Sequence, residues 1–401
     1  MYGFRDTRVI SKLYMYAFIT GAASGVWSFI PIFLLDMKGT VIQVGLLSSL
    51  PMLARTIMQM SWGRLCDETG ESKRLMFVGY VLTIIFAIPT ILSTEPWQVI
   101  LFMTLEALFS SIGGVASSVF LAYLISSRIR ARFMSTYNPI NWVGYMVGVL
   151  VAGFVIAKYG YIPALSGYII LNIFIVTFLK FFMEEANNRK EEISYGAMFK
   201  RGFLGIFSPY KRMLSLIKEG NAFIRWSLGI SLRAFGLSCV GPVLTVYMVR
   251  YLGATTPQIG TLNAVASLVR IIMMPFLGWI ADVKSRKYVF VSGVALAMFY
   301  PLIYIGSKNI NQLYFAFIIN GLFWSCLNAT WFAWEMDLIP RKQGEFLGLG
   351  GFINGVAWTI GPLVGGFLGE VDIWLNIIVS IAFITAGFVT LMATPESYKE
   401  E

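Results

Sequence analysis

The chain has no histidine and only three cysteines among its 401 residues. Histidine is the usual general base, metal ligand and pH switch, so each of those roles falls to another residue type or is missing. Cys66, Cys239 and Cys326 stand far apart with no CxxC pair, which excludes a disulfide framework and a cysteine metal site. The sequence also lacks a Walker phosphate loop and an H-E-x-x-H motif. We therefore expect neither an enzyme nor a chain that needs a metal or other cofactor.

Charge is also scarce. Charged residues make up 13% of the chain and apolar residues 57%, whereas a soluble domain is about a quarter charged. The apolar residues form runs of about 20, the length that crosses a bilayer as a helix. We predict an all-α membrane protein with twelve spans, over residues 12–35, 44–62, 75–93, 97–124, 135–157, 161–183, 222–249, 259–280, 288–306, 311–334, 345–369 and 372–393.

The net charge of +10 is explained by sidedness and does not indicate nucleic-acid binding. The loops on one side of the predicted membrane hold Arg5, Arg8, Lys12, Arg64, Lys73, Arg74, Arg128, Arg130, Arg132, Lys284, Arg286, Lys287, Arg341 and Lys342. The loops on the other side hold only Lys38, Lys158, Arg250 and Lys308. The positive-inside rule makes the first side cytoplasmic. We expect a multi-pass protein of the plasma membrane with both termini in the cytoplasm.

Two stretches about half a chain apart repeat each other. The first reads Gln43-Val44-Gly45, Arg55, Gly63, Asp67, and it returns as Gln258-Ile259-Gly260, Arg270, Gly278, Asp282. Further on, Asn141, Gly148, Gly153 and Phe154 return as Asn354, Gly361, Gly366 and Phe367. Ordered matches at a nearly constant offset indicate a duplicated unit. The sequence predicts two pseudo-symmetric six-helix bundles, 1–183 and 222–401, joined by a central loop, 184–221, and such duplicated halves are typical of secondary transporters.

The loop after the second span carries a motif. Its spaced residues are Gly63, Asp67, Gly70, Lys73 and Arg74, and the later copy keeps Gly278, Asp282 and Arg286. This pattern resembles the loop signature of the major facilitator superfamily, G-x-L-x-D-x-x-G-x-x-[KR]-[KR]. The resemblance implies the twelve-helix fold of that family, transport by alternating access, and a loop cluster that holds one conformation. It therefore implies a conformational role for Asp67 rather than contact with a solute.

A second, weaker motif lies on the fifth span. Gly144, Gly148 and Gly153 have the spacing of the family's antiporter motif, but Val149 replaces its proline and Ala152 replaces a glycine. The fuller form, Gly361-Pro362-Leu363-Val364-Gly365-Gly366, lies on the eleventh span. Two interpretations stay open: export by antiport, or close helix packing through small residues.

The central loop mixes aromatic and basic residues over Met198–Lys218. Such a segment can lie on an anionic membrane surface. The other interpretation is a plain tether between the two halves.

Ionisable residues inside spans are costly and mark functional sites. Glu106, on the fourth span, is a candidate proton-coupling residue because a carboxylate in apolar surroundings can bind a proton near neutral pH. The alternative is a structural ion pair with Arg55. Glu335, also acidic, is set aside because it lies near the end of its span.

Arg55 and Arg270 are repeat mates, each about eight residues, or ~12 Å, from the end of its span. Nitrate/nitrite porters, which belong to the superfamily, bind their anion through arginines on these two spans, so the resemblance implies an anion-binding role. The glycine-rich nitrate signatures are absent, and nitrate itself is not expected. The alternative is that both arginines join the loop cluster or bond backbone carbonyls. Arg233 adds a third positive charge, and arginine forks suit carboxylates and phosphates.

The tenth span carries a polar and aromatic stripe. Asn320, Trp324, Asn328, Trp331 and Glu335 fall on one helix face. The resemblance implies that this span lines the solute cavity, and a stripe of this kind suits an amphipathic or ring-bearing solute. Anchoring at the membrane surface is the other interpretation, for Trp331 and for its neighbour Trp334.

These observations predict a secondary transporter that moves a small amphipathic organic solute by proton antiport, as an efflux protein. The alternative is proton-coupled uptake of an organic anion. The expected partners are the solute, the proton and the lipid bilayer, with no nucleic acid, and we expect a monomer.

Overall fold

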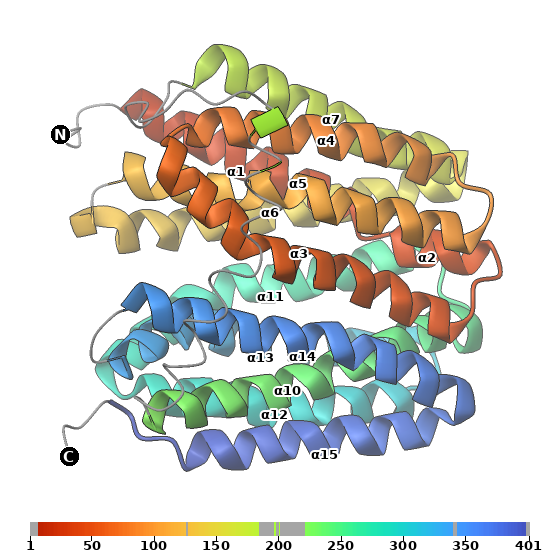
Figure 1. Cartoon of the computed structure of the whole chain (residues 1–401). Coiled ribbons are helices and arrows are strands. Elements are labelled where there is room, and N and C mark those ends of the chain that lie inside the picture. The colour runs from red at the N-terminus through yellow and green to blue at the C-terminus, as the bar shows by residue number, and fades with distance from the viewer. Residues whose placement is uncertain are drawn as a thin grey trace. The chain divides into compact units, whose positions relative to one another are not determined.

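The computed structural model describes residues 7–125, 127–183, 196–197, 200, 221–339 and 343–397. Its helices are α1 (Thr7–Trp27), α2 (Ile30–Asp36), α3 (Val41–Thr69), α4 (Ser72–Ile91), α5 (Pro96–Leu124), α6 (Ser127–Tyr159), α7 (Tyr161–Phe182), α10 (Asn221–Val246), the π-helix η1 (Tyr247–Tyr251), α11 (Thr256–Val283), α12 (Arg286–Gly306), α13 (Ile310–Asp337), α14 (Gln343–Val371) and α15 (Ile373–Met392) (Figure 1). The predicted amphipathic segment Met198–Lys218 lies outside the described residues, apart from Lys200.

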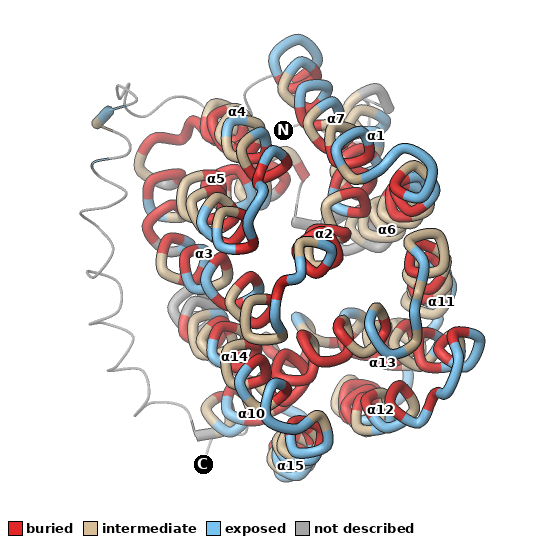
Figure 2. The backbone as a smooth tube through the Cα atoms, turned by 90° about the vertical axis from the view of Figure 1, so that its right-hand side faces the viewer, coloured by how far each residue is buried: buried red, intermediate tan, exposed pale blue. Residues whose placement is uncertain are grey.

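Among the described residues, twelve helical segments are long and apolar enough to cross a membrane, which confirms the twelve predicted spans. The first candidate span, Val9–Asp36, joins α1 to α2, and the seventh, Ala222–Tyr251, joins α10 to η1. Large apolar side chains such as Ile170, Phe181 and Ile378 are exposed. Figure 2 shows exposed and buried positions on successive turns of peripheral helices such as α15. Apolar surface of this extent suits lipid contact, since soluble monomers rarely expose it.

The repeated sequence Gln-Val/Ile-Gly begins corresponding helices. In front of α3, the backbone nitrogen of Thr40 donates to Gln43 Oε1 at 2.9 Å, and the nitrogen of Gln43 donates to Thr40 Oγ1 at 3.2 Å. In front of α11, the nitrogen of Thr255 donates to Gln258 Oε1 at 2.9 Å within a capping box. A capping box satisfies backbone donors that a helix start leaves open. The two halves thus use the same device to begin these two helices.

The chain forms two compact units. Unit 1 comprises Met1–Ile30 and Ala54–Pro209, and unit 2 comprises Pro31–Leu53 and Tyr210–Glu401. The segment 31–53, which includes α2 and the start of α3, therefore packs with the second unit although it comes early in the chain. The boundary falls within α3, two residues after Pro51, where a proline removes a helical hydrogen bond. The division into bundles at 1–183 and 222–401 stays a prediction.

In unit 1, α1 packs along α6, α4 packs along α5, and α7 contacts α1, α4 and α6. Glycine permits the close approach of α1 and α6, because a Cβ on Gly144 or Gly148 would collide with the carbonyl oxygens of Phe18 or Ala22. Gly144 and Gly148 of the fifth span therefore act as packing residues. This is one of the two roles that the sequence left open, and antiport stays a prediction.

In unit 2, α10 packs along α14 and α15, α11 along α13, and α12 along α13 and α15. Gly361 and Gly365 serve the α10–α14 crossing, because Cβ atoms there would meet Phe235 and Cys239. These helices are the repeat mates of α1 and α6, so the same small-residue crossing occurs in both units. The α10–α14 crossing includes the helix that carries Arg233, one of the charged residues described next.

Candidate functional site

Glu106, on α5 of unit 1, is buried with 4% of its surface exposed and has three donors. Its Oε1 accepts hydrogen bonds from Ser110 at 2.7 Å and Thr83 at 3.4 Å, and its Oε2 lies 3.3 Å from Nη2 of Arg55 on α3. The structure therefore brings two of the predicted site residues together as an ion pair. The Arg55 side chain is 51% exposed, so the pair joins a buried carboxylate to a guanidinium that solvent can reach.

Unit 1 also holds two aromatic contacts between its helices. The hydroxyls of Tyr16 and Tyr80 lie 2.6 Å apart, and the rings of Trp27 and Tyr168 stack with centroids 4.0 Å apart. Tyr16 and Tyr168 are buried, so these contacts belong to the packed interior of unit 1. The sequence analysis did not select these tyrosines, because single tyrosines in apolar runs are indistinguishable from ordinary core residues.

In unit 2, Arg270 on α11 lies among predicted site residues of α13. Its Nη2 donates to Oδ1 of Asn320 at 2.6 Å, and its guanidinium lies 5.9 Å from the ring centroid of Trp324. Trp324 stacks on Trp358 of α14, with centroids 6.2 Å apart and an interplanar angle of 24°. The group holds a fixed cation beside an aromatic surface, which favours an anion with a flat body.

Sequence reasoning missed Trp358. A signal was present, because tryptophans concentrate at membrane interfaces and this one lies near the middle of a predicted span. Conversely, Asn328 shares the predicted stripe but is exposed, and it makes no hydrogen bond within the part of the chain that the structure describes. Four of the five stripe residues are therefore held by contacts within unit 2, and Asn328 stands apart.

Arg233 on α10 is fully buried. None of its three side-chain nitrogens has a hydrogen-bond partner within the described chain. Its guanidinium instead lies 5.2 Å from the ring centroid of Trp331, and the indole nitrogen of Trp331 donates to Oε2 of Glu335 at 3.2 Å. One indole thus lies between a cation at its face and a carboxylate at its edge.

The loop motif differs between its two copies. In unit 2, Nη1 of Arg286 lies 2.9 and 2.8 Å from the two carboxylate oxygens of Asp337, and Nη2 lies 3.4 Å from Asp282. In unit 1, ion pairs join Arg64 to Glu68 and Arg74 to Glu71, each at 2.7 Å. The side chain of Asp67 lies outside the described residues.

The glycines of the loop motif do not serve close packing. Gly70 adopts φ 67° and closes the turn between α3 and α4, a conformation that favours glycine. A Cβ on Gly278 would meet no described atom within 4 Å, and one on Gly63 would meet only Val115, at 3.9 Å. Gly63 and Gly278 therefore do not serve a close approach of helices within the described residues.

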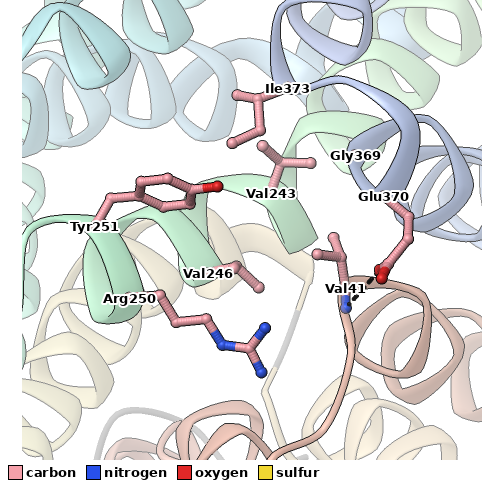
Figure 3. Close-up of a pocket in the computed structure, with 8 residues that line it drawn as sticks. All are labelled: Val41, Val243, Val246, Arg250, Tyr251, Gly369, Glu370 and Ile373. Atoms are coloured by element: carbon pink, nitrogen blue, oxygen red, sulfur yellow. Dashed lines mark hydrogen bonds between the residues drawn. The ribbon is translucent and has the colours of Figure 1, made fainter.

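A cavity of about 390 Å³ lies at the end of unit 2 that carries the α2–α3 turn (Figure 3). Figure 3 shows Arg250, Tyr251 and Glu370 around it. Arg250 donates to the carbonyl oxygen of Gly39, and Oε2 of Glu370 accepts from the backbone nitrogen of Val41 at 3.2 Å. Both charged side chains therefore bind backbone atoms of the turn. We interpret their role as structural and not as ligand binding. Among the residues that the structure describes, no cluster of acidic or cysteine side chains could hold a metal ion.

The family model described as Major Facilitator Superfamily matches residues 13–224 and 226–401 of the chain. The cis,cis-muconate transport protein of Acinetobacter baylyi is 25% identical over 343 residues, which are 82% of this chain and 79% of that protein. The quinolone resistance protein NorA of Staphylococcus aureus is 29% identical over 139 residues, 34% of this chain and 35% of that one. Other MFS-type transporters match over about half of their own length or less.

Solved structures show the same fold. A POT family transporter in complex with 5-aminolevulinic acid has a TM-score of 0.74 at 15% identity, and it covers 98% of this chain and 96% of its own. An identity this low speaks for the fold alone.

Proposed function

Because the chain belongs to the Major Facilitator Superfamily, we propose that this transporter moves a small organic anion with a flat, unsaturated body, coupled to protons. The observation that carries the proposal is Arg270, whose guanidinium is fixed by Asn320 beside the stacked rings of Trp324 and Trp358. A planar guanidinium fork suits a carboxylate, and indole faces suit a conjugated chain or ring.

The charges of the described spans support an anion. In unit 1 the acid Glu106 is matched by Arg55. In unit 2 Arg270 donates to the neutral amide oxygen of Asn320, and Arg233 is a second, fully buried cation without a hydrogen-bond partner in the described residues. A solute carboxylate offers a guanidinium such as that of Arg270 a charged, bidentate acceptor. The cis,cis-muconate transport protein, which matches most of the chain, carries a solute of this chemistry by its name.

The test uses purified protein in proteoliposomes with an imposed pH gradient. Radiolabelled cis,cis-muconate, a conjugated dicarboxylate, is compared with adipate, its saturated counterpart, and with the neutral muconic diamide. We expect uptake in the order muconate, adipate, diamide. Arg270→Gln should lower muconate uptake by about 10- to 100-fold, as expected for a lost hydrogen bond to a charged group.

The matched control is the same change at Arg225, which is exposed on α10. Arg225→Gln should leave uptake unchanged. Equal uptake of muconate and its diamide, or an Arg270→Gln variant that transports at the normal rate, would contradict the proposal.

A second function, efflux of an amphipathic solute by proton antiport, is favoured by the Trp324–Trp358 stack, which suits a neutral or cationic ring equally well. The partial match to NorA supports it. Ethidium is the discriminating probe. Proton-driven ethidium export that is lost in Trp324→Ala and kept in Arg270→Gln would select this second function.

A further inference from the structure

Glu335 is a buried acid without a cation partner. It lies in the last turn of α13, and 5% of its surface is exposed. Its Oε2 accepts one hydrogen bond, from the indole nitrogen of Trp331, and no described lysine or arginine forms an ion pair with it. Glu106 is buried to a similar extent, but its carboxylate is bound by a guanidinium and two hydroxyls.

The surroundings of Glu335 are aromatic. A Cβ on Gly350 of α14 would lie 2.9 Å from Oε1 of Glu335, 3.1 Å from the ring of Phe223 and 3.6 Å from the ring of Trp226. Trp226 and Phe290 meet the ring of Trp331 edge to face, at 5.7 and 5.9 Å between centroids. The second carboxylate oxygen therefore lies beside apolar rings and backbone. An ionised carboxylate here would be a buried charge with no cation in direct contact among the described residues.

Charged side chains lie on three elements that contact α13. From α10, Arg233 lies over the face of Trp331. From α12, Arg286 is bound by Asp337 and Asp282, and the end of α11 adds the exposed Lys284. Arg233 is thus the one buried cation among them, and it has no hydrogen-bond partner within the described chain. Glu335 thus lacks a cation partner and Arg233 lacks an acceptor. The indole ring of Trp331 lies between them.

We propose that Glu335 carries the coupled proton and that Arg233 is its counter-charge across Trp331. The proton binds to a carboxylate oxygen of Glu335 to give the neutral acid, and it leaves to water when the site opens to the other side of the membrane. Arg233 then balances the negative charge that remains. The inference rests on the proposed proton coupling, and it moves the coupling role from Glu106 to Glu335.

The first experiment detects the proton itself and needs no solute. Infrared difference spectra of the full-length protein in lipid are recorded across a pH titration, and the carbonyl stretching band of a protonated carboxylic acid is followed. We expect a titrating band that disappears in Glu335→Gln and persists in Glu106→Gln and in Glu396→Gln, a change at an exposed acid. A band that persists in Glu335→Gln would overturn the proposal.

Variants of Arg233 and Trp331 test the proposal through the pH midpoint of this band, which a purely structural role of either residue would not change. Arg233→Met removes the counter-charge, so the midpoint of the band should rise by about one pH unit. Trp331→Phe keeps a ring but removes the indole donor, and it should shift the same midpoint upward. A midpoint that stays fixed in both variants would exclude the counter-charge and the indole bond. These variants also serve if Glu335→Gln fails to fold.

The second experiment separates this inference from the proposed function. In proteoliposomes, Glu335→Gln should keep muconate exchange in the absence of a gradient within about two-fold of wild type and lose accumulation driven by a pH gradient. Accumulation at the wild-type level would overturn the proposal. If wild-type protein moves neither muconate nor adipate, the solute assignment fails, while the infrared titration still decides the role of Glu335.

Discussion

Arg286 binds both carboxylate oxygens of Asp337, and this contact joins the first turn of α12 to the last residue of α13. Arg286 belongs to the repeated loop motif, and Asp337 lies outside it. The motif in unit 2 therefore works by fastening two neighbouring helices at one end. In the structure Asp282, the motif's own acid, is the weaker partner, with its oxygen 3.4 Å from the guanidinium.

We expect Arg286→Gln to lower the free energy of unfolding by about 1 kcal/mol, because both partners are about one third exposed and solvent screens the pair. Asp337→Asn should cost a similar amount, and the double variant should cost less than the sum of the two. Thermal unfolding in detergent at low and high salt measures this. Additive losses, or losses that salt leaves unchanged, would show that the two residues do not act through their ion pair.

The crossing of α1 and α6 predicts a sharp difference between two glycines. Gly148→Ala should lower the free energy of unfolding by about 2 kcal/mol, since its Cβ would enter the backbone of Ala22. Gly167→Ala, on α7, should be neutral or slightly stabilising, because a Cβ there meets no described atom and alanine is the better helix former. Unfolding curves of the two variants provide the comparison. Equal effects would mean that α1 and α6 do not approach closely.

The spans were readable from the sequence because their number and length depend on hydropathy alone, which the bilayer imposes. Repeat matching found Arg55 and Arg270, since identical spacing survives in both halves. It also identified Gln43 and Gln258 as repeat mates. Their role as helix caps follows only from the hydrogen bonds that their side chains accept from backbone nitrogens in the structure.

Other features depend on packing between segments far apart in the chain, which no local pattern records. The segment 31–53 packs with the second unit through its close contact with α14, where a Cβ on Gly45 would strike the carbonyl of Pro362. Glu335 was set aside for its position near a span end, yet the backbone at Gly350 and the rings of Phe223 and Trp226 bury it. Burial of a polar group near a helix end cannot be inferred from its depth along the helix.

The predicted sidedness has a direct test, because the native cysteines are all buried and should react slowly with a membrane-impermeant maleimide. Cysteines introduced at the exposed positions Lys38 and Lys284 lie in loops that the positive-inside rule places on opposite sides. Lys38→Cys should be labelled in intact cells, and Lys284→Cys only after the cells are opened. The reverse pattern would invert the orientation, and labelling of both in intact cells would contradict the span count.

The ion pair of Arg55 and Glu106 leads to an asymmetric prediction. Arg55→Gln leaves the buried carboxylate with two neutral hydroxyl donors, so it should destabilise the protein by about 2 kcal/mol. Glu106→Gln leaves behind an arginine that is half exposed and can be hydrated, so it should cost about 1 kcal/mol or less. The double variant should therefore be more stable than Arg55→Gln alone, because it removes the unpaired charge as well as the pair. Thermal unfolding of the three variants at one pH and ionic strength measures this order, and a double variant less stable than Arg55→Gln would show that the carboxylate does not depend on the guanidinium.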